Sequence, residues 1–230
     1  LFRSLADLDD EQLDAIQKVV STLDVKAMFE RAMLSERCFG FFIFDKMLTD
    51  PDYLDEVAQQ GGARSRIPGF LLKFVLSADR GYYLKKMAHY VELSRQPYYK
   101  VREQLEETEE TDDRPRFAFI SALVLPSLSK AYSASAKVLA RLRCMNIALE
   151  LLKTPNRAKL GSTQDLLALT GFEGERITDP FSGEKLRAKV TEEDGKHRLE
   201  VYSVGRNGVD DGGSMGSVER DDIPFSVLLD

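Results

Sequence analysis

The sequence has few residues of the kind that build disulfide or metal frameworks. Its 230 residues include two cysteines, two histidines and no tryptophan. Two thiols cannot form a disulfide framework or a four-cysteine zinc site. Cys38 and Cys144 both lie in strongly apolar stretches with helical spacing, which predicts buried free thiols. A disulfide that joins two helices is the alternative interpretation.

Long hydrophobic runs are also missing. The longest nearly apolar run, from Phe117 to Leu125, is far shorter than the ~20 residues that cross a bilayer. The chain begins at Leu1 rather than at a methionine, so we expect that an N-terminal signal peptide or membrane anchor precedes it. Contact with a membrane is therefore expected only through that missing segment.

An excess of positive charge is absent as well. Thirty-two basic residues face 38 acidic ones, and the formal net charge is −6. A negative chain without a basic stripe repels a phosphate backbone, which argues against nucleic-acid binding driven by counterion release. We therefore expect no nucleic-acid partner.

The common enzyme signatures do not occur. The sequence has no Gly-x-Ser-x-Gly elbow, phosphate-binding loop, His-Glu-x-x-His motif or Cys-x-x-Cys pair. His89 and His197 have no catalytic partner nearby in the sequence, so we interpret both as surface residues. We predict no catalytic residue and no organic cofactor, although a glycosidase-like carboxylate pair stays open because it carries no sequence motif.

Helical periodicity dominates residues 1–155. Asp9 and Gln12 predict a capping box at a helix start. A second helix is predicted over residues 24–48, and because its second half is apolar nearly all round, we expect it at the centre of a bundle. Its Phe41 to Phe44 cluster is interpreted as core, with an apolar ligand pocket as the alternative.

Two heptad-like apolar seams follow in the same part of the chain. They run over residues 84–105 and 128–152, with apolar positions at alternating spacings of three and four. Pro97 lies within the first seam and predicts a kink or break there. The two seams complete the predicted helical bundle.

The composition changes after Asn156. Nine of the fifteen glycines fall between Gly171 and Gly216, and turns replace the helical period. Residues 185–191 and 197–204 alternate around a Glu193-Asp194-Gly195 turn, which predicts a β-hairpin.

A third strand is predicted over residues 223–228, with Pro224 favouring an edge position. The predicted fold class is therefore α+β and mostly α. It consists of a helical bundle over residues 1–155 and a small β module over residues 156–230, continuous with the last long helix.

The C-terminal segment gathers hard oxygen ligands. Four carboxylates, Asp210, Asp211, Asp221 and Asp222, accompany several glycine turns within a short stretch. Such a loop suits Ca²⁺, although no glutamate falls at the twelfth position that an EF-hand requires. Two interpretations stay open here, a Ca²⁺ site and a metal-free acidic turn held by hydrogen bonds.

Six short elements follow one another between about residues 145 and 225. They are the end of a long helix at Ala148-Leu149-Glu150, a short helix near Leu166, the turn Asp179-Pro180-Phe181-Ser182-Gly183, the hairpin, the loop Tyr202 to Gly208, and the pair Asp221-Asp222. Together they resemble the C-terminal region of the major pseudopilins of type II secretion systems. The resemblance implies that the loop binds calcium through some of the four aspartates and through backbone carbonyls.

The resemblance has two departures. A helical portion of about 145 residues precedes the shared part, and Thr154-Pro155-Asn156-Arg157 replaces the usual Tyr-Pro region. The chain therefore looks like a bacterial exported protein that carries a pseudopilin-like tail on a helical body, and pilus assembly is not carried over.

Two functions follow as hypotheses. The first is a non-catalytic structural or interaction module in the cell envelope or periplasm, with protein partners there and with Ca²⁺ stabilising the C-terminal loop. The second is a ligand-binding protein or hydrolase that uses a cleft in the helical body. The cleft would be lined by the Phe41 to Phe44 region and by acids on the helix of residues 84–105.

Overall fold

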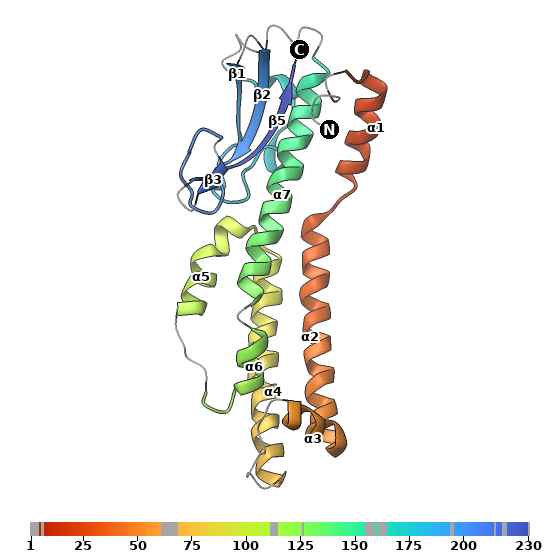
Figure 1. The fold of residues 1–230 in the computed structure, drawn as a ribbon, viewed down its shortest axis with the longest axis vertical. Coiled ribbons are helices and arrows are strands. Elements are labelled where there is room, and N and C mark those ends of the chain that lie inside the picture. The colour runs from red at the N-terminus through yellow and green to blue at the C-terminus, as the bar shows by residue number, and fades with distance from the viewer. Residues whose placement is uncertain are drawn as a thin grey trace. The chain divides into compact units, whose positions relative to one another are not determined.

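The structure is a computed structural model that describes residues 5, 7–60, 69–110, 115–125, 127–154, 160, 165–193, 196–213, 215–217 and 220–229. Long helices and a small antiparallel sheet make up these residues, which confirms an α+β fold that is mostly α (Figure 1). The contacts divide the chain into two compact units. Unit 1 covers residues 1–25, 98–100 and 133–230, and unit 2 covers residues 26–97 and 101–132.

Unit 1 joins the β elements to the first helix of the chain and to the last long one. Its elements are α1 (Asp10–Ser21), most of α7 (Ser127–Leu152), the 3-10 helices η2 (Leu167–Thr170) and η3 (Gly174–Arg176), and the strands β1 (Arg187–Glu193), β2 (Lys196–Ser203), β3 (Met215–Ser217), β4 (Arg220–Asp221) and β5 (Ile223–Leu228). The sequence placed the start of the β module at residue 156. By contacts, unit 1 also includes the first helix and most of the last long one, because apolar residues of both pack with the sheet.

The predicted hairpin is confirmed. β1 and β2 pair antiparallel with Glu193 opposite Lys196, and the turn residues 194 and 195 lie outside the described part of the chain. The predicted third strand is β5, which pairs with the other side of β2. Pro224 therefore lies on an edge strand, which is the position in a sheet that best tolerates a residue without an N–H donor.

Helix α7 carries the core of unit 1. Cys144, Ile147 and Leu151 of this helix are buried together with Leu199 and Val201 of β2. A second cluster joins α7 to α1 through Leu149, Leu152 and Leu13. Apolar residues from two faces of α7 thus pack with the sheet and with α1, which lie on different sides of the helix (Figure 1).

The start of α1 is fixed as the sequence predicts. Asp9 Oδ1 accepts a hydrogen bond from the Gln12 N–H at 2.8 Å, and Gln12 Oε1 accepts one from the Asp9 N–H at 3.2 Å. This reciprocal pair is the capping box, which satisfies donors that no helical carbonyl can reach.

Unit 2 is built on two antiparallel helices. Its elements are α2 (Val25–Thr49), α3 (Pro51–Gln60), α4 (Gly69–Ser94), most of α5 (Tyr98–Glu110), α6 (Phe119–Val124) and the first turns of α7. Arg95 Nε lies 2.8 Å from Glu30 Oε1, and the Tyr83 hydroxyl donates to the Glu36 carbonyl at 2.7 Å. The partner residues follow one another forward along α2 and backward along α4, so the two helices are antiparallel. α4 ends at Ser94, before Pro97, which confirms the predicted break.

The prediction that the second half of α2 is central was wrong. Phe44 is almost fully buried, whereas Phe39 and Phe42 are 62% and 57% exposed, and Phe41 is also exposed. The spacing of the apolar residues places them on all sides of α2, but in unit 2 the neighbouring helices cover only part of its circumference. The cluster from Phe41 to Phe44 is therefore neither a closed core nor the lining of a described cavity.

The two cysteines lie in different environments. Both are free thiols, in agreement with the first interpretation. Cys144 is fully buried in the core of unit 1, but Cys38 is exposed on α2, so the prediction of burial was wrong for Cys38. The incomplete covering of α2 is the reason in this case too.

A buried carboxylate in unit 2 was not anticipated. Asp79 of α4 is completely buried and accepts a hydrogen bond from the Ile120 N–H at 2.8 Å. It accepts two more from the N–H and the hydroxyl of Ser121. These donors belong to the first turn of α6, so Asp79 fixes the start of that helix as a distant capping group.

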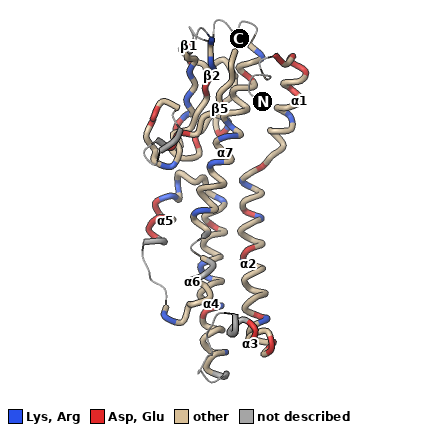
Figure 2. Tube along the Cα trace, in the orientation of Figure 1, with Lys and Arg blue, Asp and Glu red and all other residues tan. Residues whose placement is uncertain are grey.

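No described helix is long and apolar enough to cross a membrane. Lys and Arg residues are interspersed with Asp and Glu residues along α2, whereas the charges along α7 are basic except for Glu150 near its end (Figure 2).

Candidate functional site

The tail loop, residues 204–213, begins at a buried carboxylate. Asp179 is fully buried, and its Oδ1 accepts hydrogen bonds from the Phe181 N–H at 2.8 Å and the Ser203 hydroxyl at 2.7 Å. Its Oδ2 accepts one from the Val204 N–H at 2.9 Å. One side chain thus ties the Asp-Pro-Phe turn to the end of β2, and it joins two of the segments on which the pseudopilin resemblance rests.

Glycine is required where the tail loop passes the acidic pair. Gly205 has a φ of +63°, and a Cβ there would lie 1.8 Å from the Asp221 carbonyl oxygen. No larger residue fits this approach, and the positive φ disfavours any L side chain. The glycine therefore allows residues 204–206 to run directly beside Asp221.

Asp210 is held by a ring of donors. The Tyr202 hydroxyl and the Gly212 N–H donate to its Oδ1 at 3.1 and 3.0 Å, and Arg187 Nε lies 2.7 Å from its Oδ2. Burial is the largest single influence and acts to raise the pKa of Asp210, but these hydrogen bonds and the arginine charge together lower it. Asp210 is therefore an ionised carboxylate at neutral pH.

Asp222 has an unsatisfied oxygen. Its side chain is only 2% exposed, and its Oδ2 accepts a hydrogen bond from the Gly213 N–H at 2.7 Å. Its Oδ1 is buried and has no hydrogen-bond partner among the described residues. Burial raises the pKa of Asp222, and the charges of Asp211 and Asp210 raise it further, whereas backbone hydrogen bonds from Gly213 and Asp211 act in the opposite direction. A buried carboxylate oxygen beside two other acids fits a cation or an ordered water.

The remaining two predicted ligands have protein partners. Asp211 Oδ2 accepts a hydrogen bond from Asn207 Nδ2 at 3.0 Å. Asp221 Oδ2 accepts one from the Arg206 N–H at 3.1 Å, and its Oδ1 lies 3.4 Å from Lys137 Nζ. The structure thus brings three of the four aspartates within electrostatic reach of one another, while the fourth contacts Lys137 of α7.

The described residues contain no group of three or more His, Cys, Asp or Glu side chains placed to hold a metal ion. The oxygens of Asp210 and Asp211 contact Arg187 and Asn207, so they do not converge with the free oxygen of Asp222. A cation at Asp222 would therefore require at least one of these side chains to exchange its present partner for the metal.

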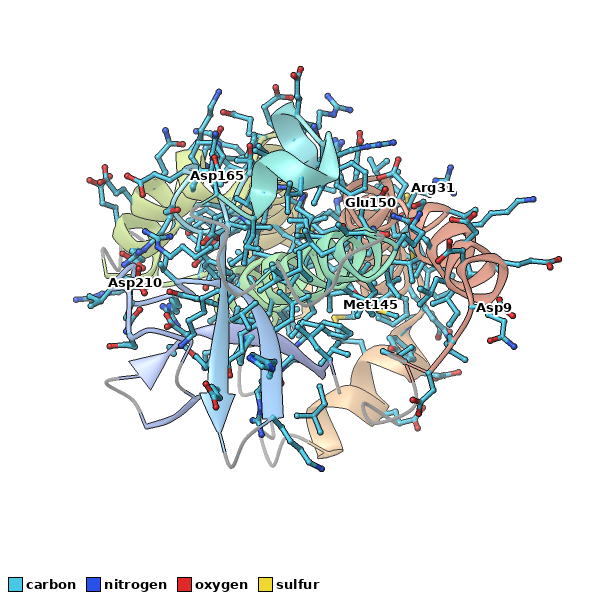
Figure 3. The ribbon with its side chains drawn as sticks, turned by 90° about the horizontal axis from the view of Figure 1, so that it is seen from above. Asp9, Arg31, Met145, Glu150, Asp165 and Asp210 are labelled. Atoms are coloured by element: carbon cyan, nitrogen blue, oxygen red, sulfur yellow. The ribbon has the colours of Figure 1, made fainter. Side chains whose placement is uncertain are left out.

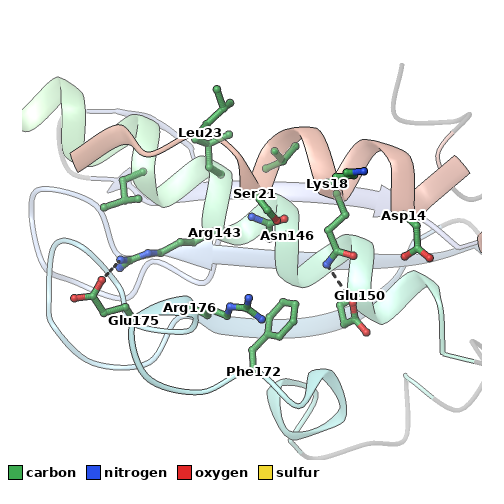
Figure 4. A pocket seen from close by; sticks show the side chains of 14 residues that line it. Asp14, Lys18, Ser21, Leu23, Arg143, Asn146, Glu150, Phe172, Glu175 and Arg176 are labelled. Carbon is green, nitrogen blue, oxygen red and sulfur yellow. Dashed lines mark hydrogen bonds and ion pairs between the residues drawn. The ribbon is translucent and has the colours of Figure 1, made fainter. Parts of the chain in front are cut away.

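A second candidate site is a cleft of about 670 Å³ formed by α1, α7 and the segment of residues 172–176. We call it the α1–α7 cleft, and Figure 4 shows the side chains that line it. Apolar side chains such as Leu142 and Phe172 share it with Arg143, Asn146 and Arg176. The α1 residues lie more than a hundred residues before the other two segments in the chain, and no motif in any of the three indicated a site. In the view of Figure 3, Asp9, next to α1, and Asp210 of the tail loop lie on opposite sides of α7.

Arg143 is the least exposed charge in this cleft. Its Nη1 donates to the Thr178 carbonyl at 2.6 Å, and its Nη2 lies 3.8 Å from Glu175 Oε2. The Arg143 side chain is 17% exposed, whereas that of Glu175 is 79% exposed. Desolvation lowers the pKa of Arg143 even though the Glu175 charge acts in the opposite direction. The ion pair is therefore too long and too solvated to compensate fully for the burial of the guanidinium.

Asn146 lies one turn further along α7. Its Oδ1 is buried and lacks a hydrogen-bond partner within the described part of the chain. Figure 4 shows its amide below Ser21, between Arg143 and Glu150. The cleft therefore presents a cation and an unsatisfied acceptor from the same face of one helix.

The two histidines are on the surface, as predicted, since His89 and His197 are both exposed. Phe41 and Phe42, for which a ligand cleft was the alternative expectation, are exposed in unit 2. The α1–α7 cleft lies instead in unit 1.

No protein-family model matches the chain, and neither does any curated protein or solved structure. The resemblance to pseudopilins therefore stays a prediction that rests on the tail residues themselves.

Proposed function

We propose that the protein is a non-catalytic interaction module of the bacterial cell envelope whose C-terminal tail loop is stabilised by Ca²⁺. The buried Oδ1 of Asp222, which has no hydrogen-bond partner in the described part of the chain, carries this proposal because it lies near the charges of Asp210 and Asp211. Calcium prefers oxygen ligands and tolerates flexible geometry, so a loop of carboxylates and glycine carbonyls suits it.

The chain's own residues have distinct parts in this proposal. Asp222 would hold the ion, with Asp211 and Asp210 as the nearest further carboxylates, and Asp179 and Gly205 position the loop around them. The ion would supply a positive partner for Asp222, which makes no ion pair with the described residues, whereas Asp210 and Asp221 each make one, and it would tie the loop to the β5 side of the sheet. A rigid loop of this kind is suited to contact other proteins.

Thermal unfolding with added CaCl₂ and with a chelator tests the calcium part. At free Ca²⁺ about 100 times its Kd, a ligand that binds only the folded state adds about 2.7 kcal/mol to the free energy of unfolding. We expect the melting temperature to rise in the wild type and to stay unchanged in Asp222→Asn.

Glu192→Gln is the matched control, since it removes an exposed carboxylate of β1 in the same module. It should respond to Ca²⁺ like the wild type. An unchanged wild-type melting temperature at millimolar Ca²⁺, with no heat of binding in calorimetry, would overturn the calcium part.

The location in the envelope is tested separately. Fractionation of source cells with an antibody against the chain should place it outside the cytoplasm, and cross-linking there should join it to other envelope proteins. Recovery in the cytoplasmic fraction alone contradicts this part of the proposal whatever the calcium result.

A further inference from the structure

The α1–α7 cleft has the size and composition of a small-ligand site. Its volume of about 670 Å³ lies within the ~300–1,000 Å³ range of ligand pockets, which combine apolar walls with a few polar groups. Leu142 and Phe172 provide apolar wall, and Arg143 and Asn146 are two of its partly buried polar groups.

Three cations and three acids line the cleft, and they are unevenly paired. Asp14 and Glu150 both line it, but an oxygen of each lies 2.8 Å from Lys153 Nζ, and Lys153 does not line the cleft. These two acids are therefore compensated from outside. At the other end, Arg143 and Arg176 line the cleft together with the exposed Glu175. The charge of the buried Asp179 also acts on Arg143, but Asp179 does not line the cleft, so two cations share one acid among the lining residues of this end.

A carboxylate would complete the contacts of Arg143. The guanidinium already donates one N–H to the Thr178 carbonyl, and its ion pair with Glu175 is long and exposed. A planar carboxylate accepts two parallel hydrogen bonds from an arginine, which is the strongest pairing open to a partly desolvated guanidinium.

An N–H donor and an apolar group would satisfy the rest of the cleft. The buried Oδ1 of Asn146 needs a donor, and it lies one helical turn from Arg143. The Phe172 ring stacks under Arg176, whose Cζ lies 5.0 Å from the ring centroid, and it offers its edge and neighbouring leucine surface to an apolar side chain.

We propose that the α1–α7 cleft binds an N-acylated apolar amino acid, either as a free molecule or as the carboxyl-terminal residue of a peptide. The carboxylate lies at Arg143 and Arg176, the N–H donates to Asn146 Oδ1, and the side chain packs on Phe172. This inference shares no residue with the tail loop, so it stands or falls independently of the calcium proposal.

Titration calorimetry with defined probes tests the inference. The probes are N-acetyl-L-phenylalanine, the peptide acetyl-Ala-Ala-Ala-Phe with a free carboxylate, and the same peptide with an amidated C-terminus. We expect saturable binding of the two acids and at least about tenfold weaker binding of the amide. Tighter binding of the peptide than of the free amino acid would identify a chain terminus as the ligand, and equal binding would identify the single residue.

Two variants and one control assign the contacts. Arg143→Gln and Asn146→Leu should each weaken the binding of the acids at least about tenfold. Arg141→Gln should not, because Arg141 is an exposed arginine of the same helix that does not line the cleft. Asn146→Leu removes no hydrogen bond of the fold, so it remains informative if Arg143→Gln loses stability with its Thr178 contact. The proposal is overturned if neither acid binds at about 10 mM, if the amide binds equally well, or if Asn146→Leu binds like the wild type.

Discussion

Asp179 is a single side chain that organises the tail. It accepts three hydrogen bonds while fully buried, from its own turn and from the end of β2. The sequence marks it as part of an Asp-Pro-aromatic turn, which predicts local turn chemistry. Its bonds to Ser203 and Val204, more than twenty residues away, depend on where the sheet brings β2. Local sequence therefore predicted the turn, and only the fold revealed the link.

Asp179→Asn should destabilise unit 1 by about 3 kcal/mol, because the amide places an N–H₂ group against donors that now bind a carboxylate oxygen. Urea unfolding followed by circular dichroism measures this loss. Asp165→Asn is the control, since Asp165 is exposed and accepts one hydrogen bond, from the Ala168 N–H. Equal midpoints for the two variants would show that the Asp179 network contributes little.

At the scale of the element, two glycines of unit 2 differ in how closely another helix packs against them. Gly40 of α2 faces Tyr83 of α4, and a Cβ there would lie 2.2 Å from the tyrosine ring. Gly81 of α4 has nothing within 4 Å of the same atom. Both residues occupy helix interiors, so their sequence contexts look alike and only the packing distinguishes them.

The two alanine substitutions should therefore have opposite signs. Gly40→Ala overpacks the contact with a buried ring and should cost about 1–3 kcal/mol of unfolding free energy. Gly81→Ala should stabilise the protein by about 0.5–1 kcal/mol through the better helix propensity of alanine. Denaturant unfolding of both variants measures the difference, and a destabilisation of similar size in both would contradict the close approach of α2 and α4.

Elements also differ in how well the sequence predicts them. The hairpin and the α1 cap were predicted correctly because strand alternation and a capping box are interactions between near neighbours. The placement of α2 was wrong because burial depends on how many neighbours surround a helix. Hydrophobic residues on all sides of a helix show that the helix is apolar, but they do not show how many neighbouring elements cover it.

The whole molecule carries a net charge of −6, and alkali adds further negative charge to it. The ionisation of Tyr83 adds a specific loss of stability at high pH to the repulsion between these negative charges. Burial raises its pKa to about 12 from the ordinary value of 10, and the nearby Glu36 contributes to the increase. The unfolded chain loses this proton near pH 10, while the folded protein keeps it until about pH 12.

The stability that comes from the neutral Tyr83 is therefore fully present below pH 10 and is lost between about pH 10 and 12. Over that interval the loss approaches about 1.4 kcal/mol per pH unit. Urea midpoints measured from pH 9 to 12 should fall more steeply for the wild type than for Tyr83→Phe, which cannot ionise at this position. Identical slopes for both proteins would rule out Tyr83 as a source of the alkaline sensitivity.

The sequence by itself determined the fold class, the starts and ends of several helices, the hairpin and the acidic composition of the tail. Each of these depends on residue types and spacings within a few turns of the chain. The tertiary structure alone decided that α2 is partly exposed, that unit 1 includes α1 and most of α7, and that Asp222 and Asn146 each keep a buried oxygen with no partner among the residues that the structure describes. These features depend on contacts between segments that are distant in sequence. The spacing of residues along one segment does not determine which other segments pack beside it.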